Sequence, residues 1–154
     1  MKRHVMYVTG TRADFGLMVS TLRAIHAHPL LRVSIVMTGM HLDPEFGDTA
    51  QEIRATSLPI VGEVPTPIGE RSGLAMAQAV GYATVGLANV IVREQPDVVL
   101  LLGDRGEMLA GAIAALHIGI PIAHIHGGDR SGTVDEPIRH AITKLSHFHF
   151  VATE

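Results

Sequence analysis

Short apolar runs rich in β-branched residues alternate with longer helical stretches along the whole chain. The runs predict six strands, over residues 4–9, 32–37, 60–64, 97–102, 120–125 and 149–152. The stretches between them predict five helices, over 14–28, 44–56, 74–94, from just after 105 to 117, and 135–147. Strands that alternate with helices are joined by right-handed crossovers into a parallel sheet. The sequence therefore predicts an α/β fold built on a doubly wound parallel sheet.

Local features refine this prediction. Asp14 is the predicted N-cap of the first helix, and Leu17, Leu22 and Ile25 are expected on one face of that helix. The run from residue 98 to 102 contains no polar residue, which is typical of a strand buried on both faces. We therefore expect this strand near the middle of the sheet.

Two segments suggest that the predicted domain is part of a larger unit. Residues 65–73 contain two prolines and two glycines, and they are predicted to form a loop that is the best candidate for a lid. The last predicted strand, 149–152, is followed by no helix that would cover it. We therefore expect these 154 residues to be one domain and one half of a larger unit.

Composition excludes several classes of protein. The formal charge of −3 and an aromatic content of 4% argue against a nucleic-acid partner. The absence of cysteine excludes disulfides, thiolate zinc sites and cysteine nucleophiles, and it fits a cytoplasmic location. No apolar run approaches the roughly 18 residues of a membrane span, and the basic start lacks a signal-peptide core. Neither a membrane partner nor export is expected.

Charged residues follow four of the predicted strands. Arg12 and Asp14 follow the first, His41 follows the second, Asp104 and Arg105 follow the fourth, and residues 126–136 follow the fifth. Because the carboxyl ends of parallel strands share one edge of a sheet, these loops are expected to form one site there. Arginine side chains and helix N-termini at that edge favour an anionic ligand such as a diphosphate.

A structural alternative exists for the same residues. Asp14 and Asp104 are each placed to cap the helix that follows, and Arg12 and Arg105 would then be their surface partners. Neither G-x-G-x-x-G nor G-x-x-x-x-G-K-[ST] occurs in the sequence, which argues against a dinucleotide oxidoreductase and a P-loop nucleotidase. No G-x-S-x-G elbow occurs either, so serine hydrolysis is disfavoured.

The histidines raise the question of a metal. His124 and His126 lie on one face of a strand end, with Asp129 close by in sequence. A third ligand is not evident, so no metal site is predicted, and His124 has the alternative of being a buried, hydrogen-bonded histidine. His126 opens a loop at the site edge, where an imidazole can transfer protons.

One dense set of acid and base groups remains, and it comes from adjacent loops. Carboxylates near an anionic ligand raise one another's pKa, which is the usual way to obtain an acid and a base near neutrality. We therefore expect chemistry on protons. The set consists of Asp104, His126, Asp129, Asp135 and Glu136.

The order and spacing of these motifs resemble the N-terminal half of the hydrolysing UDP-N-acetylglucosamine 2-epimerases of sialic-acid and related nonulosonate pathways. The resemblance covers essentially the whole chain, and the block from residue 124 to 145 is its most specific part. The motifs that carry it are Thr11-Arg12-Ala13-Asp14, Gly39 with His41-Leu42, Gly103-Asp104-Arg105, His124-Ile125-His126-Gly127-Gly128, and Ser131-Gly132-Thr133-Val134-Asp135-Glu136-Pro137-Ile138-Arg139-His140-Ala141-Ile142-Thr143-Lys144-Leu145.

The resemblance implies a Rossmann-like domain that forms one half of a glycosyltransferase-B-type architecture, with a C-terminal UDP-binding domain beyond residues 1–154. It implies elimination of UDP through 2-acetamidoglucal and then hydration, which releases UDP and N-acetylmannosamine. It also implies no cofactor, and a homo-oligomer, either a dimer or a tetramer, in the complete protein. The domain by itself is expected to be inactive.

Site residues are carried over from the family by position. Asp104, His126 and Asp135 would be catalytic, although the family often has a glutamate where this chain has His126. A histidine there resembles the bacillosamine-derived branch, so UDP-N,N'-diacetylbacillosamine is an alternative substrate, and a non-catalytic nucleotide-sugar-binding domain is an alternative of another class. The residues that would bind substrate are Arg12, Asp14, His41, Arg105, Gly127, Gly128, Ser131 and Arg139.

Overall fold

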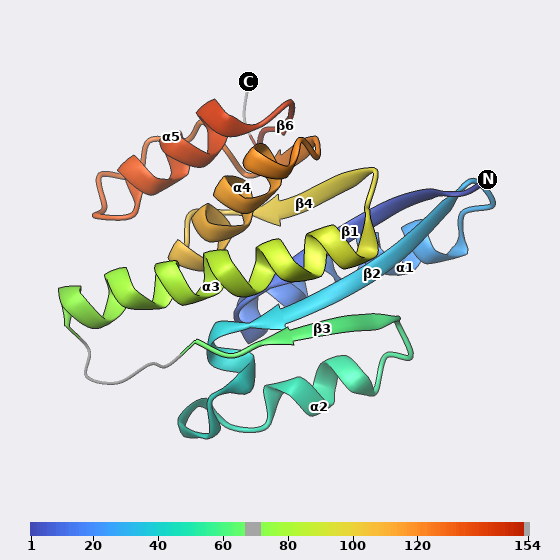
Figure 1. Ribbon diagram of the computed structural model, residues 1–154, viewed down its shortest axis with the longest axis horizontal. Coiled ribbons are helices and arrows are strands. Elements are labelled where there is room, and N and C mark those ends of the chain that lie inside the picture. Colours follow the sequence, from blue (N-terminus) through green and yellow to red (C-terminus); the bar gives the residue numbers. More distant parts are fainter. Residues whose placement is uncertain (67–71, 153–154) are drawn as a thin grey trace.

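Six parallel strands form one sheet in the computed structural model, which describes residues 1–66 and 72–152 (Figure 1). The sheet order is β3-β2-β1-β4-β5-β6, which confirms the predicted doubly wound α/β fold. The strands are β1 (Arg3–Thr9), β2 (Leu31–Thr38), β3 (Ile60–Val64), β4 (Val98–Leu102), β5 (Ile122–Ile125) and β6 (Phe148–Phe150). The helices are α1 (Arg12–Ala27), α2 (Thr49–Arg54), α3 (Gly73–Glu94), α4 (Gly106–Ile118) and α5 (Glu136–Leu145), with short 3₁₀ turns η1 (Gly39–Leu42) and η2 (Pro44–Phe46).

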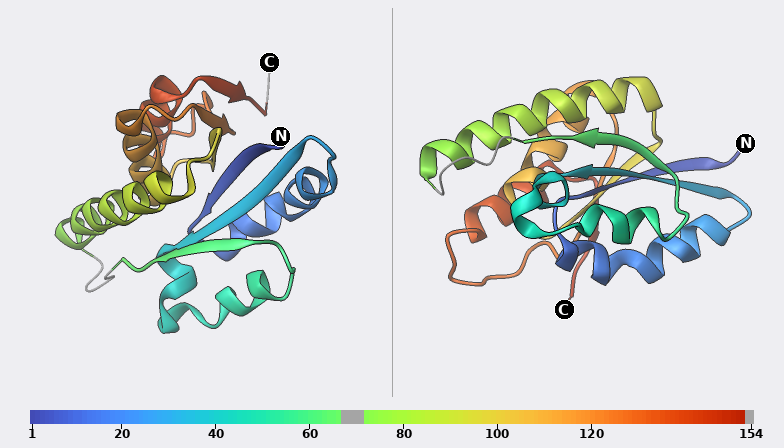
Figure 2. Two further views of the ribbon diagram at one scale, coloured as in Figure 1. Left: turned by 45° about the vertical axis from the view of Figure 1, so that its right-hand side comes forward. Right: turned by 90° about the horizontal axis from the view of Figure 1, so that it is seen from below.

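The sheet lies between two layers of helices. Helices α1 and α2 cover one face, and α3, α4 and α5 cover the other (Figure 2). The change of side follows from the strand order, because the chain builds outward from β1 to β3 and then returns to place β4 on the other side of β1. The order reverses between β1 and β4, so this point is the switch point of the sheet.

The core has two halves, one on each face of the sheet. In β1, Tyr7 packs with the α1 and α2 layer, whereas Met6 and Val8 pack with the α3 and α4 layer. In β4, Val99 and Leu101 face the second layer and Leu100 faces the first, and all three are buried. The burial of β4 on both faces confirms the expectation from its apolar run.

Helix α1 differs from the prediction at its start and on its buried face. Thr11 is the N-cap, and Asp14 occupies the third helical position of a reciprocal capping box. The predicted N-cap at Asp14 is therefore wrong by three residues. Of the three residues predicted on one face, Leu22 is fully buried and Ile25 packs against the same core, but Leu17 is 72% exposed. Phe15 and Met18 are buried beside Leu22.

Other element boundaries were also shifted. The predicted helix over 44–56 is divided into η2 and α2, because Gly47 adopts a positive φ of 82° between them. Strand β5 begins at Ile122, after Pro121, and β6 ends at Phe150. The predicted lid lies mostly outside the described residues, since residues 67–71 are not among them.

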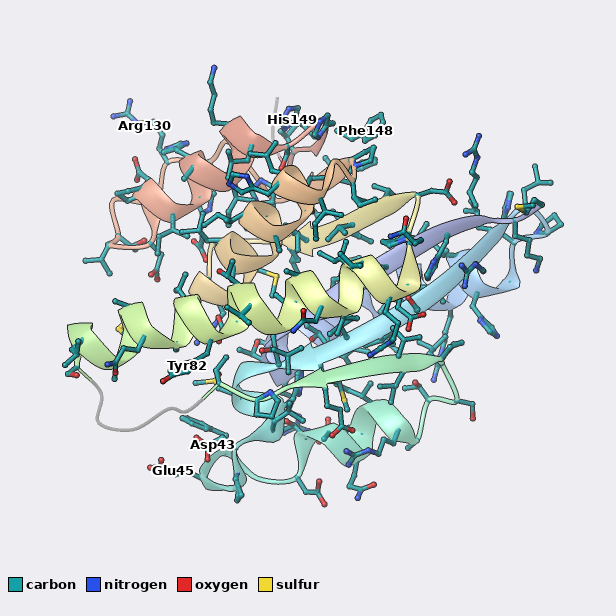
Figure 3. All side chains as sticks on the ribbon, in the orientation of Figure 1. Asp43, Glu45, Tyr82, Arg130, Phe148 and His149 are labelled. Atoms are coloured by element: carbon teal, nitrogen blue, oxygen red, sulfur yellow. The ribbon has the colours of Figure 1, made fainter. Side chains whose placement is uncertain are left out.

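Helix α3 has an exposed apolar side. By length and composition it could cross a membrane, since an 18-residue window within it has a mean hydropathy of 1.5, contrary to the expectation that no stretch would qualify. A single such helix does not indicate a membrane protein, because helices that pack on a sheet pass the same test. Here Leu87 and Ile91 are fully buried, whereas Tyr82 projects from the helix (Figure 3) and Val85 is 66% exposed.

The two leucines of α1 provide a test of this packing. Leu22→Ala should lower the free energy of unfolding by about 2–5 kcal/mol, because Leu22 is fully buried between α1 and the sheet. Leu17→Ala, on the same helix, should change it by no more than about 0.5 kcal/mol. Urea denaturation followed by circular dichroism measures both values. Equal losses would contradict the assigned buried face of α1.

Candidate active site

The carboxyl ends of all six strands lie at one edge of the sheet, as the arrowheads of β2, β3 and β4 illustrate in Figure 1. The four predicted polar loops therefore lie at the same edge. The loops after β1 and β4 flank the switch point, where open α/β sheets bind their ligands. The loops differ in which side chains they bury and which they leave accessible.

The loop between β1 and α1 is organised around the carboxylate of Asp14. One carboxylate oxygen accepts hydrogen bonds from the hydroxyls of Thr9 and Tyr7. The other accepts from the backbone N–H groups of Gly10 and Thr11, at 3.0 Å and 2.9 Å, and from the Thr11 hydroxyl at 3.1 Å. Burial, followed by the nearby Asp14 charge, raises the pKa of Tyr7, so Tyr7 remains a donor. The buried Asp14 carboxylate thus holds the loop between β1 and α1 in place through these hydrogen bonds.

His41 extends the same buried network. One ring nitrogen lies 2.9 Å from the Thr9 hydroxyl and the other lies 2.9 Å from the Thr49 hydroxyl. Burial lowers the pKa of His41, which favours the neutral imidazole. Asp14 and His41 were both predicted to bind substrate. Their contacts with substrate remain predictions, and the hydrogen bonds described for them are all with other groups of the protein.

The two arginines next to the switch point pair with glutamates. The Arg12 Nε lies 3.1 Å from a Glu52 oxygen, and the Arg12 side chain is 73% exposed. The Arg105 Nε lies 3.5 Å from a Glu107 oxygen, and the Arg105 side chain is 46% exposed. The alternative that Arg12 and Arg105 pair with Asp14 and Asp104 is therefore wrong. Both guanidinium groups remain accessible to an anionic ligand.

Asp104 is held by Arg139, which comes from α5. The Arg139 guanidinium donates to the Asp104 carboxylate and also to the backbone carbonyl of Asp129, at 3.3 Å. Arg139 itself is buried. Arg105, not Asp104, is the N-cap of α4, and no side-chain hydrogen bond caps that helix, so the alternative of a capping Asp104 is also wrong. A contact between Arg139 and substrate remains a prediction.

His124 is the buried, hydrogen-bonded histidine of the structural alternative. Its Nε2 lies 2.7 Å from the carbonyl of Gly103, and its Nδ1 lies 3.2 Å from the Thr143 hydroxyl. Burial lowers the pKa of His124 and favours the neutral ring. Because a carbonyl only accepts, Nε2 carries the proton of the neutral ring. The Thr143 hydroxyl donates to the backbone carbonyl of Arg139 at 2.9 Å.

His126 lies at the solvent side of the same strand end. Its φ of 61° is unusual for a residue other than glycine, and its ring is 47% exposed. The Nε2 of His126 lies 2.8 Å from a carboxylate oxygen of Asp129. An imidazole oriented by a carboxylate is a common arrangement for a general acid or base.

The rest of this loop is tied to the start of α5. The Glu136 carboxylate accepts from the backbone N–H groups of Ser131 and Gly132, and these bonds lower the pKa of Glu136. The Ser131 hydroxyl lies 2.9 Å from that of Thr133 and is exposed. The Asp135 carboxylate makes no hydrogen bond to any other side chain or backbone group in the described part of the chain.

The two glycines after His126 make room for this arrangement. A Cβ at Gly127 would lie 2.5 Å from His124 Nδ1 and 2.7 Å from the Thr143 hydroxyl. Gly128 has a φ of 80°, and its N–H donates to the Thr143 hydroxyl at 3.2 Å. Gly127 is buried and Gly128 is exposed, so of this pair Gly128 is the one that a ligand can approach.

Glu107 and Thr143 contact the loops of the site but were not among the site residues predicted from the sequence. Glu107 fills the space beside two loop glycines, since a Cβ at Gly39 would lie 2.6 Å from its carboxylate and one at Gly10 would lie 3.3 Å from its Cδ. Gly39 has a φ of 56°, so its lack of a side chain serves both backbone and packing. The available signal was a glycine directly after β1 and another directly after β2.

A cavity of about 560 Å³ lies at the same edge but away from Asp104, His126 and Asp135. Residues from η1, η2, α2 and the end of β3 line it, among them His41, Asp43, Arg54 and Glu63. Within residues 1–66 and 72–152, no group of three histidine, aspartate or glutamate side chains could hold a metal ion.

The fold and this edge define the class of the protein as a Rossmann-like α/β domain with a charged site at the switch point of its sheet. Residues 23–154 match the family described as UDP-N-acetylglucosamine 2-epimerase. The chain belongs to this family.

Individual relatives cover the whole chain. It is 55% identical over 154 residues to a hydrolysing UDP-N,N'-diacetylbacillosamine 2-epimerase of Legionella pneumophila, covering 100% of this chain and 41% of that protein. It is 38% identical over 154 residues to a UDP-N-acetylglucosamine 2-epimerase of Neisseria meningitidis, covering 100% of this chain and 40% of that protein. This chain thus spans about two fifths of the length of these curated relatives.

A solved structure agrees on the fold. The crystal structure of the Neisseria meningitidis UDP-GlcNAc 2-epimerase bound to UDP-GlcNAc superposes with a TM-score of 0.80 at 22% identity, covering 96% of this chain and 39% of that one. At this identity the likeness shows the fold alone.

The buried position of Asp14 makes a testable prediction. Asp14→Ala should lower the free energy of unfolding by at least about 3 kcal/mol, because several buried donors lose their acceptor. The matched control is Asp48→Ala at the start of α2, where no side-chain hydrogen bond caps the helix and a change below about 0.5 kcal/mol is expected. Thermal and urea denaturation measure both. Unchanged stability of the Asp14 variant would leave ligand contact as its role.

Proposed function

We propose that this chain is the N-terminal domain, residues 1–154, of a hydrolysing UDP-amino-sugar 2-epimerase, and that a C-terminal UDP-binding domain completes the enzyme. Membership of the UDP-N-acetylglucosamine 2-epimerase family supports this proposal. So does the length of the relatives, of which this chain spans about two fifths. The two domains would form a glycosyltransferase-B-type pair, with the sugar nucleotide between them, and this domain by itself would be inactive.

The observation that carries the proposal is a connected set of acid and base groups at the switch-point edge. The Arg139 guanidinium donates hydrogen bonds to the Asp104 carboxylate and to the Asp129 carbonyl. The Asp129 carboxylate lies beside the His126 ring at 2.8 Å. Asp135 begins the first turn of the helix that carries Arg139. Such a set suits proton transfer at a carbon next to a leaving group.

The proposed reaction has two steps. A base removes the proton from C2 of the sugar while the bond from C1 to the diphosphate oxygen breaks, which gives a glycal and UDP. Water then adds to C1, and a proton is delivered to C2 from the opposite face, which releases the free sugar inverted at C2. Asp104, His126 and Asp135 would supply the proton transfers, and none of the steps requires a cofactor.

The diphosphate needs positive charge as it leaves. Arg12 and Arg105 are the proposed contacts, because both are exposed on either side of the switch point. Gly128 and Ser131 would meet the sugar, since they are exposed in the loop that begins with His126. The buried Asp14, His41 and Gly127 would support these residues from beneath.

The identity of the sugar is the finer part of the proposal. The relative of 55% identity acts, by its name, on UDP-N,N'-diacetylbacillosamine, and the relative of 38% identity on UDP-N-acetylglucosamine. The difference in identity favours UDP-N,N'-diacetylbacillosamine for this protein, with UDP-N-acetylglucosamine as the second candidate. The absence of cysteine is compatible with a cytoplasmic enzyme.

Proton NMR in D₂O tests the reaction directly. The longest polypeptide encoded by the reading frame around this chain should convert one of the two UDP-sugars into UDP and a free sugar with deuterium at C2. The 154-residue chain alone serves as the paired control and should give no product. UDP-sugar inverted at C2 without release of UDP would contradict hydrolysis, and binding without turnover of either sugar would identify a nucleotide-sugar-binding protein.

We also propose that the complete protein is a homo-oligomer whose contact surface includes the exposed side of α3, where Tyr82, Val85 and Val92 are 56%, 66% and 55% exposed. Val85→Glu should then reduce the molar mass measured by light scattering to that of a smaller species, because a charge in an apolar contact is costly. Ser20→Glu, at an exposed position of α1, is the control and should leave the mass unchanged. An unchanged oligomer in the Val85 variant would exclude this surface.

A further inference from the structure

We propose that Arg139 is a positioning residue, which fixes Asp104 and the loop that carries Asp129 and His126 relative to each other and does not contact the substrate. This inference rests on the proposed function and deepens it. It also changes the role that sequence position alone suggested for Arg139.

The burial of Arg139 is the first argument. Its side chain is only 10% exposed, and its Nε is shut off from solvent with no hydrogen-bond partner in the described part of the chain. A ligand at the surface cannot reach that nitrogen. The two terminal nitrogens already donate inward, one to the Asp104 carboxylate and one to the Asp129 carbonyl. By contrast, the side chain of Arg12 is 73% exposed.

The position of its partners is the second argument. Asp104 belongs to the loop after β4, and Asp129 belongs to the loop after β5. The Asp129 carboxylate in turn lies 2.8 Å from the His126 ring. A planar guanidinium that bridges both loops therefore sets the separation and orientation of two predicted catalytic groups.

A second connection between the same loops lies one helical turn further along α5. The Thr143 hydroxyl accepts from the Gly128 N–H at 3.2 Å and lies 3.2 Å from Nδ1 of the neutral His124 ring, whose Nε2–H donates to the Gly103 carbonyl. Gly103 precedes Asp104, and Gly128 precedes Asp129. Helix α5 thus connects both loops twice, once through a charged group and once through neutral groups.

Proton transfer depends strongly on such positioning, since a misplacement of about 1 Å can reduce a rate by roughly 100-fold. A positioning residue affects turnover without affecting the binding of UDP. A residue that contacts the diphosphate affects UDP binding in the ground state. The two roles are therefore separable by measuring the turnover number and the UDP affinity of the same variants.

The experiment uses the longest polypeptide of the reading frame, with turnover followed by NMR and UDP binding by calorimetry. Arg139→Gln should lower kcat by about 100-fold and leave the Kd for UDP within about twofold. Arg12→Gln is the matched comparison and should weaken UDP binding by about tenfold. Lys144→Gln, on the exposed side of α5, should change neither value.

A double-mutant cycle adds a test that loss of stability alone would not pass. If Arg139 acts in part through Asp104, then Arg139→Gln should cause a smaller fold-loss of kcat in an Asp104→Asn background than in the wild type. Multiplicative losses would overturn the proposal, and so would a UDP Kd raised in Arg139→Gln as much as in Arg12→Gln.

A second pair of variants covers the case in which Arg139→Gln does not fold. Thr143→Val removes the neutral connection while keeping the shape of the side chain, and Thr143→Ser keeps the hydroxyl. The Val variant should lose kcat with unchanged UDP affinity, and the Ser variant should recover it. Equal kcat in wild type and the Val variant would overturn positioning by α5. Absence of turnover in the wild type with both UDP-sugars would instead overturn the proposed function, and the present inference with it.

Discussion

The reversal of strand order between β1 and β4 is the constraint on which the rest of the structure depends. All six strands are parallel, so every strand delivers its polar loop to the same edge. The reversal separates the loops after β1 and β4, because the chain continues from β1 into α1 on one face of the sheet and from β4 into α4 on the other face. Charged side chains from distant parts of the sequence can meet there without being buried in the core.

Polar groups beneath this edge are held by two separate networks. On the β1 side, the Asp14 carboxylate collects the donors of its own loop, and His41 extends the network through Thr9. On the β5 side, α5 presents Arg139 and Thr143 to the loops after β4 and β5. Buried charge is stable only when it is paired or hydrogen-bonded, and both networks meet that requirement. The exposed side chains of Arg12 and Arg105 lie at the surface of the same edge.

Some predictions from the sequence succeeded because they depend on local chemistry. The alternation of apolar runs and helices sufficed for the fold class, and the run in β4 sufficed for its burial on both faces. The prediction of one helix over 44–56 was wrong because Gly47 interrupts it, and Leu17 was wrongly assigned to the buried face of α1, since its side chain is exposed. Both errors concern which way a short segment turns against its neighbours, which periodicity alone does not resolve.

The sequence by itself determined the α/β fold class, the loops that carry the charged residues and the resemblance to the epimerase family, because each is written in residue order and spacing. Only the tertiary structure decided which of those residues are buried and which charges pair. Arg139 meets Asp104 across 35 positions and Arg12 meets Glu52 across 40. Such partners are brought together by helix packing over the sheet, and no local pattern in the chain specifies them.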